Sequence, residues 1–142
     1  MTLVTDAAGL DLARFLRPGD RIVMGQACGE PTTLVEALIA QGKDIGGLSA
    51  FIATSFSGLF TPGTAASFAL SSMGAIGALR GMTKAGKLAV IPAHVSQIGP
   101  MITAGIIGCD VAFIQVSPAD ENGNHSCGLI SDHVRAAVER AR

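Results

Sequence analysis

Short apolar runs alternate along this chain with segments whose apolar residues fall three or four positions apart. Residues 21–25 (RIVMG) predict a short buried strand, because an apolar run follows the turn-forming segment 17–20 (RPGD). Pro31 suits the first position of a helix, and Gly42 suits its end. Between them, apolar side chains keep helical spacing at Leu34, Val35, Leu38 and Ile39. The pattern therefore predicts a strand, a glycine-containing loop and a helix.

The same alternation continues to the end of the chain. We predict further strands at residues 48–53, 88–91 and 111–116, and helices at residues 10–16, 98–107 and 131–142. Pro100 falls in the first turn of its helix, and Ser131 or Asp132 can cap the last one. Alternating strands and helices indicate an α/β fold, with a mostly parallel sheet flanked by helices and right-handed crossovers.

The stretch from Ile45 to Leu79 contains no charged residue and imitates a membrane segment. A spanning helix needs about 20 predominantly apolar residues in a row. Here glycines, Pro62 and many Ser and Thr residues break the run into short pieces. Buried strands and tight loops are therefore expected, with no membrane contact.

The length and composition of the chain indicate which kinds of partner it can have. The 142 residues suffice for one domain, or for one lobe of a larger protein. Only 15% of residues are charged and 49% are hydrophobic, so we expect a second lobe or subunit, or another copy of the chain, to cover much of the surface. A net charge of -1, with no Tyr or Trp, argues against nucleic acid as a partner.

The N-terminal segment, the cysteines and the histidines indicate where the protein is located and whether it binds a metal. Residues 1–16 lack the basic region and unbroken apolar core of a signal peptide, so a cytoplasmic location is expected. Cys28, Cys109 and Cys127 show no CxxC spacing, and we expect small buried side chains in a reducing cytosol. No histidine pair has metal-ligand spacing with a carboxylate, so no metal is expected.

The loop at residues 25–31 (GQACGEP) is the main candidate site. It lacks the GxGxxG pattern of dinucleotide sites and the Lys-Ser/Thr of a Walker loop. It follows a strand and precedes a helix, where free N–H groups favour an anion, although the glycines also suit a simple tight turn. Glu30 is expected to complement the helix dipole, and no nearby base supports Cys28 as a nucleophile.

Other polar residues give weaker candidates. His94 and Ser96 follow the predicted strand 88–91, so we expect them at the same sheet edge as the loop, in substrate contact or in loop hydrogen bonds. His125 and His133 are expected to be solvent or loop histidines. The segment from Glu121 to Gly123 is a turn in a loop rich in turn formers.

Three blocks of the sequence resemble the N-terminal region of the acetyl-CoA hydrolase/transferase family, which includes acetate, succinate and 4-hydroxybutyrate CoA-transferases. These blocks are FLRPGDRIVMGQACGEPTTLVEAL, IPAHVSQIGPMI and DVAFIQVSPADENGNHSCG. The resemblance covers nearly the whole chain and is loosest at residues 45–79. It implies a family I CoA-transferase-like (Rossmann-like) fold, with residues 1–142 as the N-terminal lobe and a second lobe elsewhere.

The resemblance also implies a mechanism. In the family a glutamate attacks an acyl-CoA, and CoA is transferred through a glutamyl-CoA thioester to a small carboxylate; water gives hydrolysis instead. The glycine loop lies against the reacting carbonyl, which carries over to Gly25, Gln26, Ala27, Cys28, Gly29, Glu30 and Pro31. The nucleophilic glutamate belongs to the second lobe. Glu121 falls in a first-lobe turn of SPxDxxG type and is not the counterpart.

The expected function is therefore the first lobe of a CoA-transferase or acetyl-CoA hydrolase, inactive without its second lobe. Bulky substitutions at Gly25 or Gly29 should reduce turnover far more than folding. The main alternative is a non-catalytic binding or regulatory module with the same fold. A nucleotide-binding Rossmann-like domain is a third reading, disfavoured by the missing fingerprint.

Overall fold

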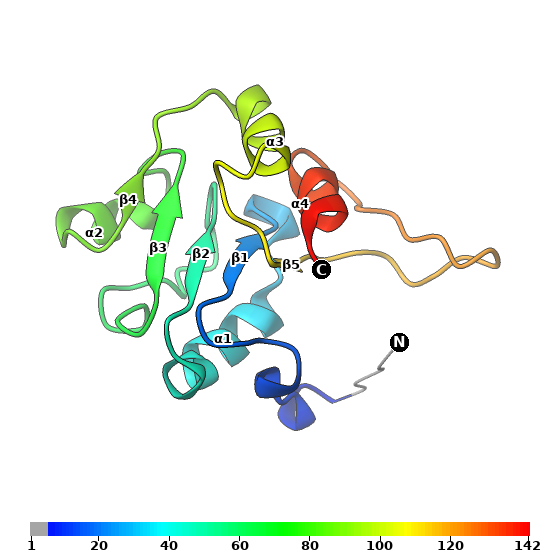
Figure 1. Cartoon of the computed structure of the whole chain (residues 1–142), viewed down its shortest axis with the longest axis horizontal. Coiled ribbons are helices and arrows are strands. Elements are labelled where there is room, and N and C mark those ends of the chain that lie inside the picture. The colour runs from blue at the N-terminus through cyan, green and yellow to red at the C-terminus, as the bar shows by residue number, and fades with distance from the viewer. Residues whose placement is uncertain (1–5) are drawn as a thin grey trace.

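A five-stranded, fully parallel sheet forms the centre of the molecule in the computed structural model, which describes residues 6–142 (Figure 1). Its strands are β1 (Arg21–Met24), β2 (Ser49–Phe51), β3 (Ala69–Ser72), β4 (Ala89–Val90) and β5 (Val111–Phe113). The order β4-β3-β2-β1-β5 places β1 in the interior, between β2 and β5. The predicted α/β fold is confirmed. Residues 1–5 of the stretch compared with signal peptides lie outside the described residues.

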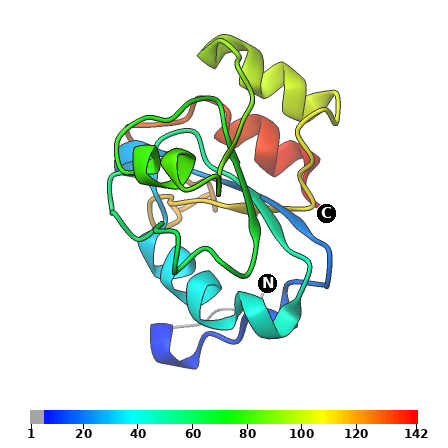
Figure 2. The same cartoon turned by 90° about the vertical axis from the view of Figure 1, so that its left-hand side faces the viewer.

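Helices cover both faces of the sheet, which makes three layers. They are α1 (Thr32–Ile45), α2 (Leu79–Lys84), α3 (Val95–Thr103) and α4 (Val134–Arg140), with short 3-10 turns η1 (Ala7–Gly9), η2 (Leu12–Arg14) and η3 (Ala27–Gly29). Figure 2 shows α1 on one face and α3 beside α4 on the other. None of the helices in the described part of the chain is long and apolar enough to cross a membrane.

The strands have short apolar runs because both of their faces are buried. Successive side chains of a strand point to opposite faces. Ile22 and Met24 therefore pack in the core under α1, whereas Val23 packs in the core under α3 and α4. In β2, Ala50 likewise packs in the core under α1 and Phe51 in the core under α3 and α4. The uncharged stretch 45–79 supplies much of this buried material, as the pattern predicts.

Several predicted element boundaries are wrong. The predicted helix 10–16 is replaced by 3-10 turns, because Asp11 accepts the N–H of Ala13 and ends the regular pattern. The helix α3 starts earlier than predicted, with the Gln97 side chain accepting the N–H of His94, so Pro100 lies inside the helix. The last helix starts after His133, and neither Ser131 nor Asp132 caps it.

Two elements in the middle of the chain have no separate counterpart in the prediction. The strand β3 reads ALSS, and its buried Ser72 hydroxyl lies within hydrogen-bond distance of two carbonyl oxygens, of Ala53 (2.9 Å) and Gly74 (2.8 Å). The helix α2 follows it and adds Leu79 and Met82 to the core under α1. A polar strand of this kind lacks the hydrophobic pattern on which the prediction rested.

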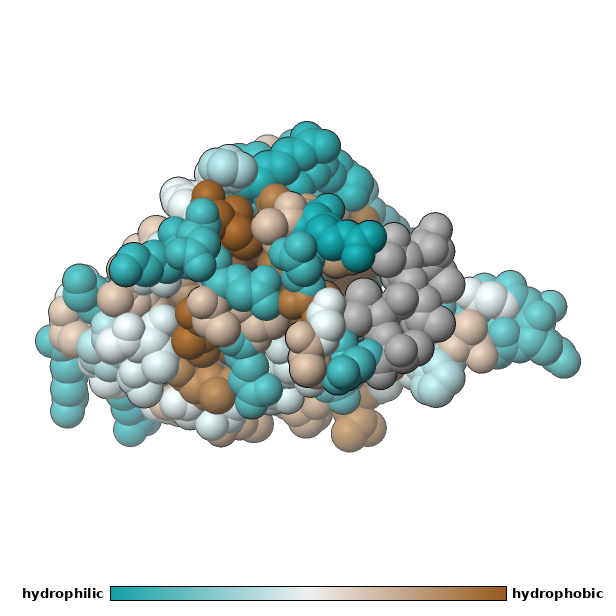
Figure 3. Space-filling model, turned by 90° about the horizontal axis from the view of Figure 1, so that it is seen from below, coloured by the Kyte–Doolittle hydropathy of each residue, from teal (hydrophilic) through white to brown (hydrophobic). Residues whose placement is uncertain are grey.

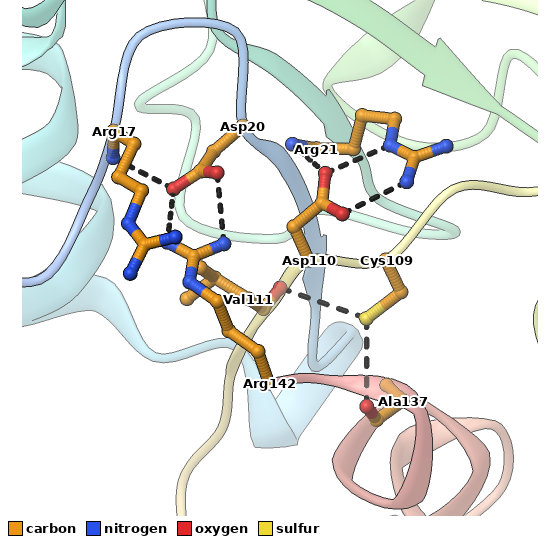
Figure 4. A network of polar contacts seen from close by, with 8 residues as sticks. All are labelled: Arg17, Asp20, Arg21, Cys109, Asp110, Val111, Ala137 and Arg142. Atoms are coloured by element: carbon orange, nitrogen blue, oxygen red, sulfur yellow. Dashed lines mark hydrogen bonds and ion pairs between the residues drawn. The ribbon is translucent and has the colours of Figure 1, made fainter.

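Ion pairs tie the chain together at the amino edge of the sheet (Figure 4). Arg142 donates to both carboxylate oxygens of Asp20, at 2.8 and 2.6 Å. Arg21 donates in the same way to Asp110, at 2.8 Å for each bond. Bidentate pairing with arginine holds the pKa of both carboxyl groups below their usual range. The view from below shows apolar patches among the polar side chains on this side of the molecule (Figure 3).

Candidate functional site

The glycine loop leaves β1 at the carboxyl edge of the sheet and is hydrogen-bonded to the end of β5 and to the segment that follows β2. The N–H of Gly25 donates to the carbonyl of Phe113 at the end of β5, 2.9 Å away. The N–H of Ala27 donates to the carbonyl of Thr54 beyond β2, 2.8 Å away. Ala27 has φ +50°, a left-handed conformation unusual for a residue other than glycine. The predicted loop therefore follows β1, and hydrogen bonds join it to the segments on either side.

Internal hydrogen bonds decide which loop N–H groups remain free. Gly29 donates to the carbonyl of Gln26 (2.8 Å) and Glu30 to that of Ala27 (3.2 Å), which forms the η3 turn. Pro31, the residue before α1, has no N–H. Only the N–H groups of Gln26 and Cys28 find no acceptor in the loop or elsewhere in residues 6–142. These two donors are the ones that a bound oxyanion can use.

The carboxylate of Glu30 is buried and bonds the loop that follows β2. Its side chain accepts hydrogen bonds from the hydroxyls of Ser55 and Ser57, both at 2.8 Å. It also accepts the N–H groups of Phe56 (3.0 Å) and Ser57 (3.2 Å). Only 4% of the surface of Glu30 is exposed. Its hydrogen bonds connect the glycine loop to the loop after β2. The expectation that it only complements the helix dipole is therefore incomplete.

A second polar chain joins the loop to the start of α4. The side-chain amide of Gln26 donates to the carboxylate of Asp132. The next residue, His133, is 3% exposed, and its Nε2 lies 2.9 Å from the carbonyl oxygen of Met24 in β1. Its ring packs edge-on against Phe51. Of the two expected settings for His133, solvent or loop, the solvent setting is wrong: His133 lies in the turn before α4, but its ring is buried.

A cavity of about 270 Å³ lies beside the glycine loop. It is lined by Cys28 and Gly29 from the loop, and by residues 115–117 and 126–129 from the segment after β5. Cys28 is exposed and Cys127 half-buried, so the expectation of buried cysteines holds only for Cys109. Burial raises the pKa of the Cys109 thiol.

His94 and Ser96 lie farther along the same edge. Both are exposed and belong to the start of α3, after the edge strand β4. The strands β3 and β2 separate β4 from β1, and no hydrogen bond among the described residues joins either side chain to the glycine loop. Ser96 lines a different hollow, with Pro92, Pro100 and Ile106. Their role as substrate contacts stays a prediction.

The segment containing Glu121 forms an arm that leaves the body of the molecule (Figure 1). Asp120 shapes its tip by accepting the N–H groups of Asn122 (2.9 Å) and Asn124 (2.7 Å). His125 lies exposed at the arm, with its Nδ1 2.9 Å from the Ser117 carbonyl oxygen. The turn predicted for this segment is confirmed. Among residues 6–142, no group of three His, Cys, Asp or Glu side chains is placed to hold a metal ion.

Comparison with known proteins identifies the family. The sequence profile of the acetyl-CoA hydrolase/transferase N-terminal domain matches residues 8–142. The chain belongs to this family. The family covers CoA-transferases and acetyl-CoA hydrolases, and the resemblance drawn from the three sequence blocks is confirmed.

Individual relatives agree with this assignment. The chain is 28% identical to the 4-hydroxybutyrate coenzyme A transferase of Clostridium kluyveri over 124 residues, which is 86% of this chain and 29% of that protein. Its fold matches RipA from Yersinia pestis (TM-score 0.82, 22% identity, 92% of this chain and 33% of that one). It also matches 4-hydroxybutyrate CoA-transferase from Porphyromonas gingivalis (TM-score 0.65, 22% identity, 92% of this chain and 29% of that one). The chain spans about a third of the length of these proteins.

Proposed function

We propose that this chain is the first lobe of a CoA-transferase or acetyl-CoA hydrolase, and that its glycine loop stabilises the oxyanion formed from an acyl-CoA thioester. The observation that carries the proposal is that the N–H groups of Gln26 and Cys28, at the carboxyl edge of the sheet, have no acceptor within residues 6–142. The other N–H groups of the loop are bonded internally or to neighbouring strands. A preorganised backbone donor contributes about 2.7–4 kcal/mol to such a reaction.

The reaction proceeds by covalent catalysis in the family manner. A glutamate carboxylate attacks the thioester carbonyl, and the tetrahedral oxyanion collapses to an acyl-glutamyl anhydride with loss of CoA thiolate. The thiolate attacks the glutamyl carbonyl, which releases the original carboxylate and leaves a glutamyl-CoA thioester. A second carboxylate then takes the CoA by the reverse steps, whereas attack by water gives hydrolysis. The loop serves each tetrahedral intermediate.

The nucleophile is supplied from outside residues 1–142, by a second lobe of the same polypeptide or by a partner subunit. Glu30 is buried and its carboxylate already accepts four hydrogen bonds, and Glu121 is exposed on the arm. The strand β5 pairs only with β1 among the described strands, so its outer edge is open. A hollow of about 450 Å³ lies beside it, lined mainly by apolar residues such as Leu10, Phe15 and Leu34. These features support docking of a second lobe.

The remaining parts of the proposal are a cytoplasmic location, coenzyme A bound as acyl-CoA, no metal, and assembly with a further copy of the chain. The low charge of the sequence supports such assembly. The alternative is a non-catalytic module that kept the fold. The Gln26 and Cys28 N–H groups support the enzyme, because within residues 6–142 they have no protein acceptor and so remain available to a ligand.

Trapping the covalent intermediate tests the proposal. The protein is incubated with acetyl-CoA and a carboxylate acceptor, alone and together with the second lobe. Borohydride or hydroxylamine then traps the enzyme-bound CoA thioester, and mass spectrometry locates the modified residue. We expect a modified glutamate in the second lobe only. No trapped species with both lobes present would favour the non-catalytic module, and a modification at Glu30 or Glu121 would contradict the assignment of the nucleophile.

A further inference from the structure

The buried carboxylate of Glu30 fills a receptor that would otherwise suit an anion. Two backbone N–H groups and two hydroxyls from Ser55, Phe56 and Ser57 converge on its two oxygens. Consecutive N–H groups of this kind bind anions in many proteins. None of the ion pairs in the described part of the chain includes Glu30, so hydrogen bonds alone satisfy it.

The carboxylate joins two loops that come from neighbouring strands. Glu30 ends the glycine loop after β1, and its partners form the loop after β2. A second bond, from the N–H of Ala27 to the carbonyl of Thr54, holds the same two loops together. Ser55 in turn pairs with Gly77 in the loop after β3. The loops of three adjacent strands therefore form one connected layer at the carboxyl edge of the sheet.

The consequence lies at the surface of this layer. The Phe56 side chain is 69% exposed, although its N–H is bonded to the buried Glu30 carboxylate. Movement of the Glu30 carboxylate would therefore shift both the exposed Phe56 and the loop that carries the free N–H groups.

We propose that Glu30 is a positioning residue of the candidate site, which holds the segment 55–57 against the glycine loop. This inference rests on the proposed function. Glu30 acts through hydrogen bonds and not as a nucleophile, acid or base. Its charge is therefore not essential, because a glutamine has one oxygen for the two N–H groups and an NH₂ group that can donate to the two serine hydroxyls.

The test compares Glu30→Gln with Glu30→Ala in the protein assayed with its second lobe. We expect Glu30→Gln to keep kcat/KM within about threefold of the wild type, whereas Glu30→Ala loses about a hundredfold, as for a misplaced reacting group. Amide hydrogen exchange of Phe56 and Ser57 should accelerate at least about tenfold in Glu30→Ala and stay near wild type in Glu30→Gln. The exposed Ser57 offers a milder variant, Ser57→Ala, which removes one hydroxyl bond and should give intermediate values if Glu30→Ala does not fold.

Each result decides a different point. Loss of activity in Glu30→Gln with normal amide protection would overturn the inference, because it would assign a role to the charge. Normal protection in Glu30→Ala would overturn it as well. A wild-type protein that transfers no CoA would refute the proposed function, while the exchange measurement would still show whether Glu30 holds the two loops together.

Discussion

The carbonyl oxygen of Gly29 occupies the space that a Cβ atom on Gly25 would need. The backbone of Gly25 is also fixed by its bond to the carbonyl of Phe113, so the loop cannot easily shift to make room. A Cβ atom on Gly29, by contrast, would lie 3.5 Å from the Cβ of Ile130, which is an ordinary contact. The two glycines of the loop therefore serve different purposes.

Alanine at these two positions should give different results. Gly25→Ala should lower the free energy of unfolding by about 1–3 kcal/mol, as overpacking does, and should slow CoA transfer at least about tenfold by displacing the donors. Gly29→Ala serves as the matched control and should change stability by less than about 0.5 kcal/mol. Urea unfolding and steady-state transfer rates measure both. Equal effects at the two positions would contradict the geometry.

Replacing Ala27 by glycine should stabilise the protein, whereas glycine in place of a helical alanine should destabilise it. Its φ of +50° is costly for a side chain with a Cβ atom, by about 1–2 kcal/mol. We expect Ala27→Gly to raise the free energy of unfolding by about 0.5–1 kcal/mol, after the entropy cost of glycine is subtracted. The control is Ala40→Gly on the exposed side of α1, which should destabilise by about 1 kcal/mol. A loss of stability in both variants would rule out backbone strain at Ala27.

Local patterns were enough to predict β1, the glycine loop and the start of α1, although α1 continues to Ile45 and the predicted end at Gly42 is wrong. An apolar run, a turn signal before it, and Pro31 at the helix start are all features of neighbouring residues, so they can be read without the fold. The same reasoning predicted α4 to within a few residues, although its cap was misplaced. The strand β3 was not located, because serine occupies half of its four positions and its pairing with β2 supplies the missing stability.

The contacts of the site were harder to predict. The place of Glu30 at a helix start predicts only that it complements the helix dipole, whereas its four bonds go to residues that lie 25 to 27 positions later in the sequence. Nothing near His133 in the sequence predicts its burial, because its partner Met24 lies 109 positions earlier. Only the order of strands in the sheet brings such groups together. The one sequence-level signal was the unusual run of Ser and Thr in the uncharged stretch 45–79, which supplies the hydroxyl donors to Glu30.

The ion pair between Asp20 and Arg142 should make stability depend on pH in the acid range. The Arg142 guanidinium lowers the pKa of Asp20 in the folded state, so its contribution is complete above the unfolded pKa of about 3.9. The contribution is lost as the pH falls through the folded-state pKa. Asp20→Ala should lower the free energy of unfolding by about 1–3 kcal/mol at pH 7, and the difference from wild type should shrink below about pH 4.

The matched control is Asp44→Ala. Asp44 is exposed on α1, and its side chain makes no hydrogen bond or ion pair within residues 6–142. Its removal should change stability by no more than about 0.5 kcal/mol at either pH. Urea unfolding at pH 7 and pH 3.5 gives both values. A difference for Asp20→Ala that persists unchanged at low pH would mean that packing, and not the ion pair, explains the loss.

Thiol reagents should distinguish Cys28 from Cys109 and probe the candidate site. The exposed Cys28 should react first with N-ethylmaleimide, whereas Cys109 is buried, has a raised pKa and should react only after unfolding. An adduct on Cys28 would occupy the cavity beside the free N–H groups and should slow CoA transfer at least about tenfold. Cys28→Ala keeps the backbone donor, so it should remain active and become resistant to the reagent. An inactive Cys28→Ala variant that folds normally would assign chemistry to the thiol itself and contradict a role limited to the backbone.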